Sequence, residues 1–432
     1  MSDQATLRLQ RELLEYSRTP DDQIFIKYND ENIMQVRALI IGPVNTPYSL
    51  GAFEFKLEFP RQYPTLPPTV HILTTDGGVT RFNPNLYAGG KVCLSILGTW
   101  AGEAGEQWSP AQSISSVLLS IQSLMSENPY ENEPGYGKNE RNYLGGAFHS
   151  AKSEKKEDKK KNEEDTVVSE AAATKEAEET FDLADGESPA AKFMYTNDFA
   201  DICKRLLLWH YDNYVDICEK ESARVEDGEE FRLMPFEFAG NGMQGEFAYA
   251  SLLRRLAVIK KAVLEEEKNW IEQSAQWLAD DSGTAANLRG QYEQIVNSGC
   301  LEGVDIELES DNPYIWNVVI FGKPLSQYDG GLFRLRMVFH DQFPEVLPRA
   351  TFATPVYHPL VTEGGVPYYR VIREEDVKAH IKAICDLFVE DPTPNPSAHV
   401  NRKAAALYFG DAEERRQYFR NVRRCAARSI EY

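Results

Sequence analysis

The sequence predicts an α+β fold in which an antiparallel four-stranded meander sheet with flanking helices is present twice, joined by a disordered tether and a helical extension. One observation is a series of short segments with alternating apolar residues, as at Phe53, Phe55 and Leu57, which indicates strands with one buried face. The other is an internal repeat at a constant offset (322 − 42 = 280). Its matching residues are Gly42, Tyr48, Gly51, Phe53, Phe55 and Phe59 in the first half, and Gly322, Tyr328, Gly331, Phe333, Leu335 and Phe339 in the second.

The first copy opens with an amphipathic helix over Thr6 to Tyr16, where leucines fall on one side and charged residues on the other. Glycine and proline then separate short apolar segments, as expected for an antiparallel meander. The predicted strands are Gln23–Tyr28, Met34–Ile41, Phe53–Phe59 and Val70–Leu73. A second helix is predicted over Ser113 to Ser126, because its apolar residues recur at helical spacing.

The second copy keeps the same order of features. Phe343-Pro344 matches Tyr63-Pro64, and His358-Pro359 matches Asn83-Pro84 at a slightly smaller offset (358 − 83 = 275), so a few loop residues are missing. Helical patterns over Asn287–Val296 and Asp376–Phe388 flank these motifs. They complete a second domain of the same kind.

Between the copies the composition changes twice. Residues 149–192 are dense in Lys and Glu with few large apolar groups, so they bury too little surface to offset chain entropy and are expected to form a disordered linker. Residues 193–280 carry two apolar stripes at helical spacing, from Phe199 to Val215 and from Leu252 to Val263, and predict a helical extension. The expected domains are therefore 1–148, the linker 149–192, the extension 193–280, and 285–432.

Composition excludes several classes of partner. The formal net charge of −21 argues against nucleic acid, whose binding depends on neutralised phosphates. No apolar run approaches the roughly 20 residues of a membrane-spanning helix, and the first residues lack the core of a signal peptide. The six cysteines form no CxxC pair, which favours a reducing compartment. We therefore expect no membrane association and a cytoplasmic location, a nuclear location, or both.

The segment around Cys93 carries the chemistry, and it reads Asn83-Pro84-Asn85-Leu86-Tyr87-Ala88-Gly89-Gly90-Lys91-Val92-Cys93. A protease thiol needs a histidine base, and none of the seven histidines marks itself as a partner of Cys93. Eight positions earlier (93 − 85 = 8) lies Asn85, whose amide donates hydrogen bonds to an oxyanion or a loop but cannot remove a proton. This combination favours a thiol that carries an acyl group and passes it on, and it disfavours a Cys–His hydrolase.

The residues on both sides of this segment identify a family. They are Gly42-Pro43, Thr46-Pro47-Tyr48, Gly51, Phe53, Phe55, Phe59-Pro60, Tyr63-Pro64 and Pro67-Pro68 before it, and Trp108-Ser109-Pro110-Ala111 after it. This series resembles the ubiquitin-conjugating enzymes. It is most similar to their large Z-type members, through Arg81 to Asn85, Val92 to Trp100 and Trp108 to Tyr130. The resemblance is strong over about residues 1–145 and continues more weakly to about residue 275.

The resemblance implies an enzyme in which Cys93 accepts ubiquitin, or a ubiquitin-like modifier, as a thioester and passes it to a substrate lysine or a ligase cysteine. Asn85 matches the asparagine that steadies the tetrahedral intermediate or the nearby loop; the alternative is a local Asx-type turn. The implied partners are the modifier, an activating enzyme, ubiquitin ligases and protein substrates. No cofactor or metal is implied, because the upstream activating enzyme uses the ATP. An acidic gate for the attacking lysine is expected at Glu131 or Glu133, with ordinary solvated charge as the alternative for each.

The second copy lacks this chemistry. At the 275 offset, Asn85 corresponds to Leu360 and Cys93 to Tyr368, and a phenol cannot hold a thioester. Cys385 is no substitute, because it falls among apolar residues of a predicted helix. We therefore expect an inactive domain that binds ubiquitin or a partner enzyme, or one that only stabilises the chain. For the whole protein, the alternative to a conjugating enzyme is a non-catalytic ubiquitin- or ligase-binding protein in which Cys93 is idle.

Overall fold

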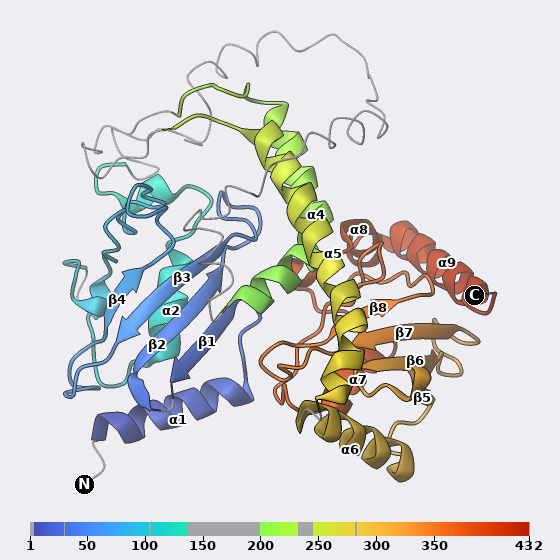
Figure 1. The fold of residues 1–432 in the computed structure, drawn as a ribbon. Coiled ribbons are helices and arrows are strands. Elements are labelled where there is room, and N and C mark those ends of the chain that lie inside the picture. The colour runs from blue at the N-terminus through green and yellow to red at the C-terminus, as the bar shows by residue number, and fades with distance from the viewer. Residues whose placement is uncertain are drawn as a thin grey trace, which may run out of the picture. The chain divides into compact units, whose positions relative to one another are not determined.

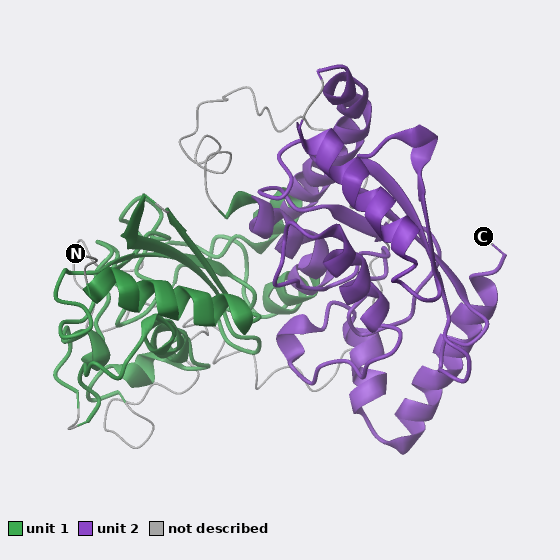
Figure 2. Cartoon of the chain, turned by 90° about the horizontal axis from the view of Figure 1, so that it is seen from below, with its two compact units in different colours: residues 1–200, 215–255 green, residues 201–214, 256–432 purple. Residues whose placement is uncertain are grey.

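The two copies fall into two compact units. A computed structural model of the protein describes residues 4–29, 31–102, 105–136, 199–231, 245–280 and 283–431. One unit is built from residues 1–200 and 215–255, and the other from residues 201–214 and 256–432 (Figure 2). We refer to them as unit 1 and unit 2. The predicted linker, residues 149–192, lies outside the described residues, and the expected domain boundaries stay a prediction.

Unit 1 contains the first predicted sheet and its helices (Figure 1). Its regular elements are α1 (Gln4–Arg18), β1 (Ile24–Asn29), β2 (Asn32–Ile41), β3 (Ala52–Glu58), β4 (Thr69–Ile72), α2 (Ile114–Ser123) and the 3-10 helices Ser95–Leu97 and Pro129–Asn132. All three strand pairs are antiparallel, in the order β1-β2-β3-β4. The predicted meander and both predicted helices are therefore confirmed.

The core of unit 1 lies between one face of this sheet and the two helices. Helix α1 buries Ala5, Leu9 and Leu13, and α2 buries four apolar residues. From the sheet come Phe55 and Leu57, both fully buried. Burial of these large apolar side chains is the main stabilising contribution, at about 25 cal/mol per Å² of apolar surface. The sheet and helices provide a rigid base for the loops that follow β4.

Helices α4 (Ala200–Ser222) and α5 (Tyr249–Ala279) form the predicted extension, and each contributes residues to both units. Within unit 1, the Asp227 carboxylate accepts hydrogen bonds from Tyr249 N and Ala250 N at 2.9 and 3.0 Å. These are among the first backbone donors of α5, which have no partner inside the helix. Asp227 therefore fixes where α5 begins.

Unit 2 holds the second sheet (Figure 1). Its elements are α6 (Gly283–Ser298), β5 (Val304–Leu308), β6 (Ile315–Phe321), β7 (Leu332–Val338), β8 (Arg349–Phe352), α7 (Val377–Asp386), α8 (Arg402–Phe409), α9 (Ala412–Arg428) and the 3-10 helices Glu309–Asp311 and Pro396–Ala398. The strand order is β5-β6-β7-β8, again antiparallel throughout. The repeated fold predicted from the sequence is confirmed, whereas α8 and α9 were not predicted.

The register of the two sheets is the same at the predicted offset. Ile40 pairs with Phe53 in the first sheet, and Ile320 pairs with Phe333 in the second. The glycines are retained for the same steric reason. A Cβ at Gly42 would lie 1.9 Å from Tyr48 O, and one at Gly322 would lie 1.8 Å from the Tyr328 oxygen. No side chain fits at that approach, which explains why glycine stands at both positions.

Candidate active site

Cys93 lies at the end of a short hairpin that follows β4. Cys93 N donates to Asn85 O at 2.9 Å, and Tyr87 N donates to Lys91 O at 3.0 Å. The chain reverses at Gly90, which has a φ of +90° and lies so close to β4 that a Cβ would be 3.1 Å from Ile72 O. A residue with a side chain is strained in that conformation. The Gly-rich sequence before Cys93 therefore forms a turn that brings Asn85 and Cys93 side by side.

Asn85 and Cys93 are joined twice. Besides the backbone bond, Asn85 Nδ2 donates to the carbonyl oxygen of Cys93 at 3.0 Å. Both residues are buried, at 7% and 3% exposure. The other side-chain atom of Asn85, Oδ1, is buried and has no hydrogen-bond partner among the described residues. In this structure the side-chain amide of Asn85 therefore holds the backbone of Cys93 in place.

The Asx-type turn, expected as an alternative role for Asn85, is made by Asn83 instead. Asn83 Oδ1 accepts from Asn85 N at 2.9 Å, which is the Asx geometry. Asn83 Nδ2 donates to Tyr48 Oη at 2.9 Å and to Leu124 O at 2.8 Å. Tyr48 in turn donates to Phe82 O at 2.7 Å, and burial raises the pKa of Tyr48, so its hydroxyl stays protonated. Asn83 therefore has a structural role in positioning the loop.

Thr99 supports Cys93 from the other side. In the sequence it was quoted only as part of the segment Val92 to Trp100, without a role of its own. Its hydroxyl accepts from Leu94 N at 2.9 Å and lies 2.8 Å from Val92 O, to which it donates. One side chain thus joins the residues immediately before and after Cys93. A threonine six positions after a cysteine (99 − 93 = 6) has no distinctive pattern, and it becomes visible only once the 3-10 helix Ser95–Leu97 folds it back.

Arg81 supports the start of the same hairpin. Its Nη2 donates to Pro84 O at 2.6 Å, and its guanidinium lies 4.4 Å from the ring centroid of Tyr87. The residue is only 4% exposed. A guanidinium stacked on an aromatic face and bonded to a carbonyl replaces part of the hydration it loses. Arg81 was noted in the sequence as part of the family motif, without a role.

A buried carboxylate organises the other end of unit 1. Glu12, 5% exposed, accepts from Tyr63 Oη at 2.9 and 2.7 Å and from Ile114 N, at the start of α2, at 2.9 Å. Arg8 forms an ion pair with it and also donates to Gln112 O at 3.2 Å. The Arg8 guanidinium is thus bound within unit 1. Arg11, on the same helix, is exposed.

The two candidates for an acidic gate lie in and just after the 3-10 helix Pro129–Asn132. Glu131 is exposed, and its carboxylate accepts from Asn128 Nδ2 at 3.1 Å. Glu133 is half-buried, and its backbone N donates to Tyr130 O at 3.0 Å. The choice between them stays open.

The second copy has the same hairpin with different side chains. Tyr368 N donates to Leu360 O at 2.7 Å, as Cys93 N does to Asn85 O. His358 takes the place of Asn83: its Nδ1 accepts from Leu360 N at 3.0 Å. Gly365 takes the place of Gly90, with a φ of +84°. The predicted correspondence of Tyr368 with Cys93 and of Leu360 with Asn85 is therefore seen in the backbone itself.

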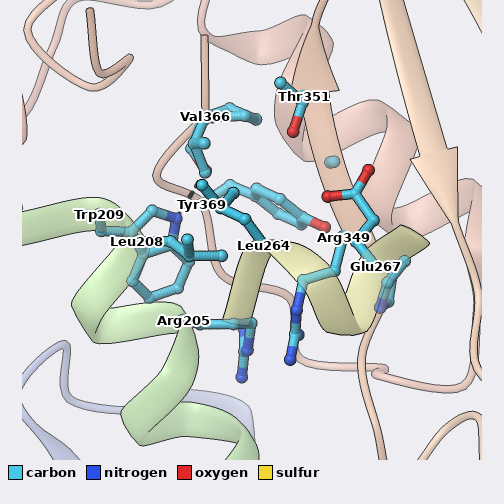
Figure 3. Close-up of a pocket in the computed structure, with 12 residues that line it drawn as sticks. Arg205, Leu208, Trp209, Leu264, Glu267, Arg349, Thr351, Val366 and Tyr369 are labelled. Carbon is cyan, nitrogen blue, oxygen red and sulfur yellow. Dashed lines mark hydrogen bonds between the residues drawn. The ribbon is translucent and has the colours of Figure 1, made fainter. Parts of the chain in front are cut away.

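Helix α4 covers this position in unit 2. The rings of Trp209 and Tyr368 meet edge to face with centroids 4.7 Å apart, and Trp209 Nε1 donates to Pro367 O at 2.8 Å. Beside them lies a cavity of about 30 Å³, lined from α4, α5 and β8 by Arg205, Glu267 and Arg349 among others (Figure 3). That volume holds a water molecule but no larger ligand. The surface that carries the nucleophile in the first copy is an interior contact here.

Two arginines that line this cavity are paired with Asp201 of α4. Arg349, 4% exposed, lies 2.8 Å from a carboxylate oxygen of Asp201, and Arg205 lies 3.1 Å from the other. Burial raises the pKa of Glu267. Burial also raises the pKa of Cys385, to about 12, so this thiol stays protonated and unreactive at neutral pH. The arrangement binds α4 to the second sheet.

No helix in the described part of the chain is long and apolar enough to cross a membrane. No group of three or more His, Cys, Asp or Glu side chains there is placed to hold a metal ion.

Comparison with known proteins agrees with this geometry. A family model described as ubiquitin-conjugating enzyme matches twice, over residues 8–146 and 288–426, which together exceed half of the chain. Ubiquitin-conjugating enzyme E2 Z of Xenopus tropicalis is 36% identical over 274 residues, covering 62% of this chain and 74% of that protein. Ubiquitin-conjugating enzyme E2 Z of Homo sapiens is 36% identical over 289 residues, covering 66% and 71%.

A third relative matches a shorter stretch of this chain. The dual E2 ubiquitin-conjugating enzyme/E3 ubiquitin-protein ligase BIRC6 of Homo sapiens is 50% identical over 115 residues, which cover 26% of this chain and 2% of that protein. The chain belongs to the ubiquitin-conjugating enzyme family, as a Z-type member in which the conjugating domain is duplicated. It is accordingly a ubiquitin-conjugating transferase.

Proposed function

We propose that Cys93 is the acyl-carrying nucleophile of this enzyme and that the second copy carries no acyl group. The thiolate of Cys93 attacks the carbonyl carbon of ubiquitin's C-terminal thioester on an activating enzyme. A new S–C bond forms, and the activating enzyme's cysteine leaves as a thiolate. A substrate lysine then attacks the same carbon as a neutral amine, forms the amide, loses its proton and releases the Cys93 thiolate. Thioester exchange is close to energy-neutral, so the domain needs chiefly to position and stabilise.

The observation that supports this proposal most directly is the contrast between the two hairpins. The same backbone pairing carries an amide and a thiol at Asn85 and Cys93, but an apolar side chain and a phenol at Leu360 and Tyr368. The equivalent tyrosine also packs against Trp209 of α4. The first copy therefore has the groups that acyl transfer needs, and the second has lost them.

Asn85 positions the site in this proposal. Its Nδ2 holds the Cys93 carbonyl, and its unpaired Oδ1 leaves room for rearrangement when the tetrahedral intermediate forms. The amide then donates to the oxyanion, or it continues to hold the loop while another donor serves. Loss of one donor to an oxyanion usually lowers the rate on the order of 100-fold.

The modifier and partners belong to the same proposal. Ubiquitin is the modifier named for the relatives, and we extend it to this chain together with an activating enzyme, ligases and protein substrates as partners. The enzyme needs no cofactor of its own, because the activating enzyme uses the ATP. Exposed Arg11, rather than Arg8, is the α1 arginine available to an activating enzyme. We place the protein in the cytoplasm, the nucleus or both.

A charging assay tests the nucleophile. The full chain is mixed with activating enzyme, ATP and ubiquitin, and is resolved on a gel with and without thiol reductant. We expect a reductant-labile band that Cys93→Ala abolishes and Cys93→Ser makes reductant-resistant. Cys300→Ser, at an exposed cysteine of the second copy, is the matched control and should leave the band unchanged.

The opposite results are equally informative. If the band persists in Cys93→Ala and disappears in Cys300→Ser, the nucleophile is assigned to the wrong copy. If a panel of activating enzymes and ubiquitin-like modifiers gives no band at all, Cys93 is idle. The chain is then better described as a ubiquitin- or ligase-binding protein.

A further inference from the structure

Helix α9 (Ala412–Arg428) leads to the C-terminal end of unit 2 (Figure 1). It is strongly basic in an acidic protein. Its sequence holds six arginines and no lysine, whereas the whole chain has a net charge of −21. Tyr418, Val422 and Ala426 are buried and attach one side of the helix to unit 2. Tyr418 packs edge to face on Tyr408 of α8, with centroids 5.1 Å apart. The helix is thus firmly placed, with its other side free for a different role.

Five arginines occupy that other side, which we call the arginine face: Arg416, Arg420, Arg423, Arg424 and Arg428. At about 100° per residue they lie opposite the buried stripe. All five are exposed. The sixth, Arg415, belongs to the flank, because its guanidinium lies 4.8 Å from the ring centroid of Tyr408.

The arginine face is not neutralised by the helix or its neighbours. Within the described residues none of its arginines forms an ion pair; Arg420 donates to Gln417 Oε1, and Arg423 Nε donates to Phe419 O at 3.3 Å. Four of the five follow one another at i, i+4 spacing, where like charges destabilise a helix. Other helices place an acid at that spacing, as in Lys382–Asp386 at 2.6 Å. The unpaired positive charge of the arginine face therefore favours binding of an anionic partner.

Arginine, unlike lysine, binds carboxylates and phosphates in a planar, bidentate way. The length of the arginine face then decides which kind of anion fits. The face is short: Arg416 to Arg428 spans about 18 Å at 1.5 Å per residue, the length of five or six extended residues. Glu413 precedes it and Glu431 follows it, both exposed. A polyanion that continued past either end would meet these carboxylates, whereas a short acidic segment would not.

We propose that the arginine face of α9 binds a short, extended acidic segment of a partner protein. This role goes beyond the conjugating chemistry and does not require Cys93. Nucleic acid is the less favourable occupant, because its charge is continuous and the chain as a whole is acidic. The second copy would thus serve as a recruiting domain that uses its outermost helix, since the surface equivalent to the active site is covered by α4.

Binding of fluorescein-labelled hexaglutamate to the full chain, followed by fluorescence anisotropy at low and physiological salt, tests the proposal. We expect saturable binding that weakens with salt. The triple variant Arg416→Glu/Arg420→Glu/Arg424→Glu should bind at least about 10-fold more weakly, since it removes three charge pairs and adds repulsion. Hexaglutamine should not bind. The Cys93→Ser enzyme should bind as wild type does, so failure here is distinguishable from failure of the nucleophile.

Two matched variants distinguish the loss of the arginine face from a change in net charge and from misfolding. The triple variant Lys261→Glu/Lys268→Glu/Lys323→Glu changes the net charge equally at exposed positions elsewhere in unit 2, and its affinity should stay within about 3-fold of wild type. Lysine in place of the same three arginines keeps the charge and the helix, and should weaken binding about 3-fold through the lost bidentate geometry.

Three results would overturn the proposal. One is equal binding of hexaglutamate by wild type and the arginine-reversal variant while both melt at the same temperature. Another is tighter binding of a six-nucleotide thymidine oligomer than of hexaglutamate, which would assign the face to nucleic acid. The third comes from sedimentation velocity: a wild-type dimer that the reversal converts to a monomer would assign the face to a second copy of the chain.

Discussion

Trp209 of α4 covers Tyr368, the residue that stands where Cys93 stands in the first copy. Their rings meet edge to face at 4.7 Å between centroids, and the indole donates to the carbonyl of Pro367, the residue just before Tyr368. The second copy has therefore lost more than its nucleophile: the surface around that position has become part of the interior of unit 2.

The first prediction concerns the stability of that contact. Trp209→Ala removes a buried ring and leaves the Pro367 carbonyl without its donor, so the free energy of unfolding of unit 2 should fall by about 3 to 5 kcal/mol. Urea unfolding followed by circular dichroism measures the change. Trp100→Ala is the control, because Trp100 is 39% exposed and its loss should change stability by less than about 1 kcal/mol. Equal effects would show that α4 contributes little to unit 2.

The second prediction concerns activity at the covered position. Leu360→Asn/Tyr368→Cys restores the amide and the thiol of the first copy, and it is placed in a Cys93→Ala background. We expect no reductant-labile ubiquitin band, because Trp209 and His210 pack against position 368 and keep a large partner away. The same double substitution with Cys93 intact checks that the chain still folds and charges. A labile band in the Cys93→Ala background would mean that α4 leaves this position readily.

The third prediction concerns Thr99, which joins Val92 and Leu94 on either side of Cys93. Thr99→Val keeps the shape of the side chain but removes both hydrogen bonds. A net loss of about 0.5–1.5 kcal/mol in positioning corresponds to about a 3- to 10-fold slower discharge of charged enzyme to free lysine. Thr99→Ser retains the hydroxyl and should discharge at nearly the wild-type rate. If valine and serine behave alike, the hydroxyl does not position the thiol.

Most of the fold could be predicted from the sequence, because the features that specify it are local or repeated. Alternating apolar residues in β3 and β7 gave the strands, and the constant offset gave the second sheet. The offset is physically meaningful: Gly42 and Gly322 both lie against a tyrosine carbonyl at a distance that excludes any side chain. Because sterics require glycine at both positions, this part of the repeat is present in the second copy although the thiol and the amide are not.

The residue roles that could not be predicted from the sequence depend on contacts formed only in the folded chain. Nothing in the sequence of α4 indicates that Trp209 packs on Tyr368, because the two are 159 positions apart (368 − 209 = 159) and all four strands of the second sheet lie between them in the chain. Thr99 was quoted only as part of the family segment, since a single threonine carries no spacing signal. The Asx turn was expected only as an alternative role for Asn85, whereas Asn83, on the other side of the same proline, makes it. Such roles require the folded chain.

The last prediction is that acid lowers the stability of the second copy. Burial, with the nearby Arg402, lowers the pKa of His210 to about 3, and burial, with the nearby His399, lowers that of His358 to about 3. In the unfolded chain both titrate near 6.5. Their contribution to stability is therefore fully present above pH 6.5 and is lost as the pH falls toward 3. Burial likewise lowers the pKa of His380, to about 4. Between pH 7.5 and 5.5 the three groups together should lower the free energy of unfolding of unit 2 by about 4 kcal/mol.

Urea unfolding followed by tryptophan fluorescence at both pH values measures this loss, since four of the six tryptophans, Trp209, Trp270, Trp277 and Trp316, lie in unit 2. His358→Asn is the matched variant, because asparagine stands at the equivalent position 83, where its side chain accepts from the backbone as His358 does. It should reduce the acid-induced loss by about a third while leaving stability at pH 7.5 within about 1 kcal/mol. An undiminished pH dependence in His358→Asn would mean that His358 is not among the groups that take up protons on unfolding.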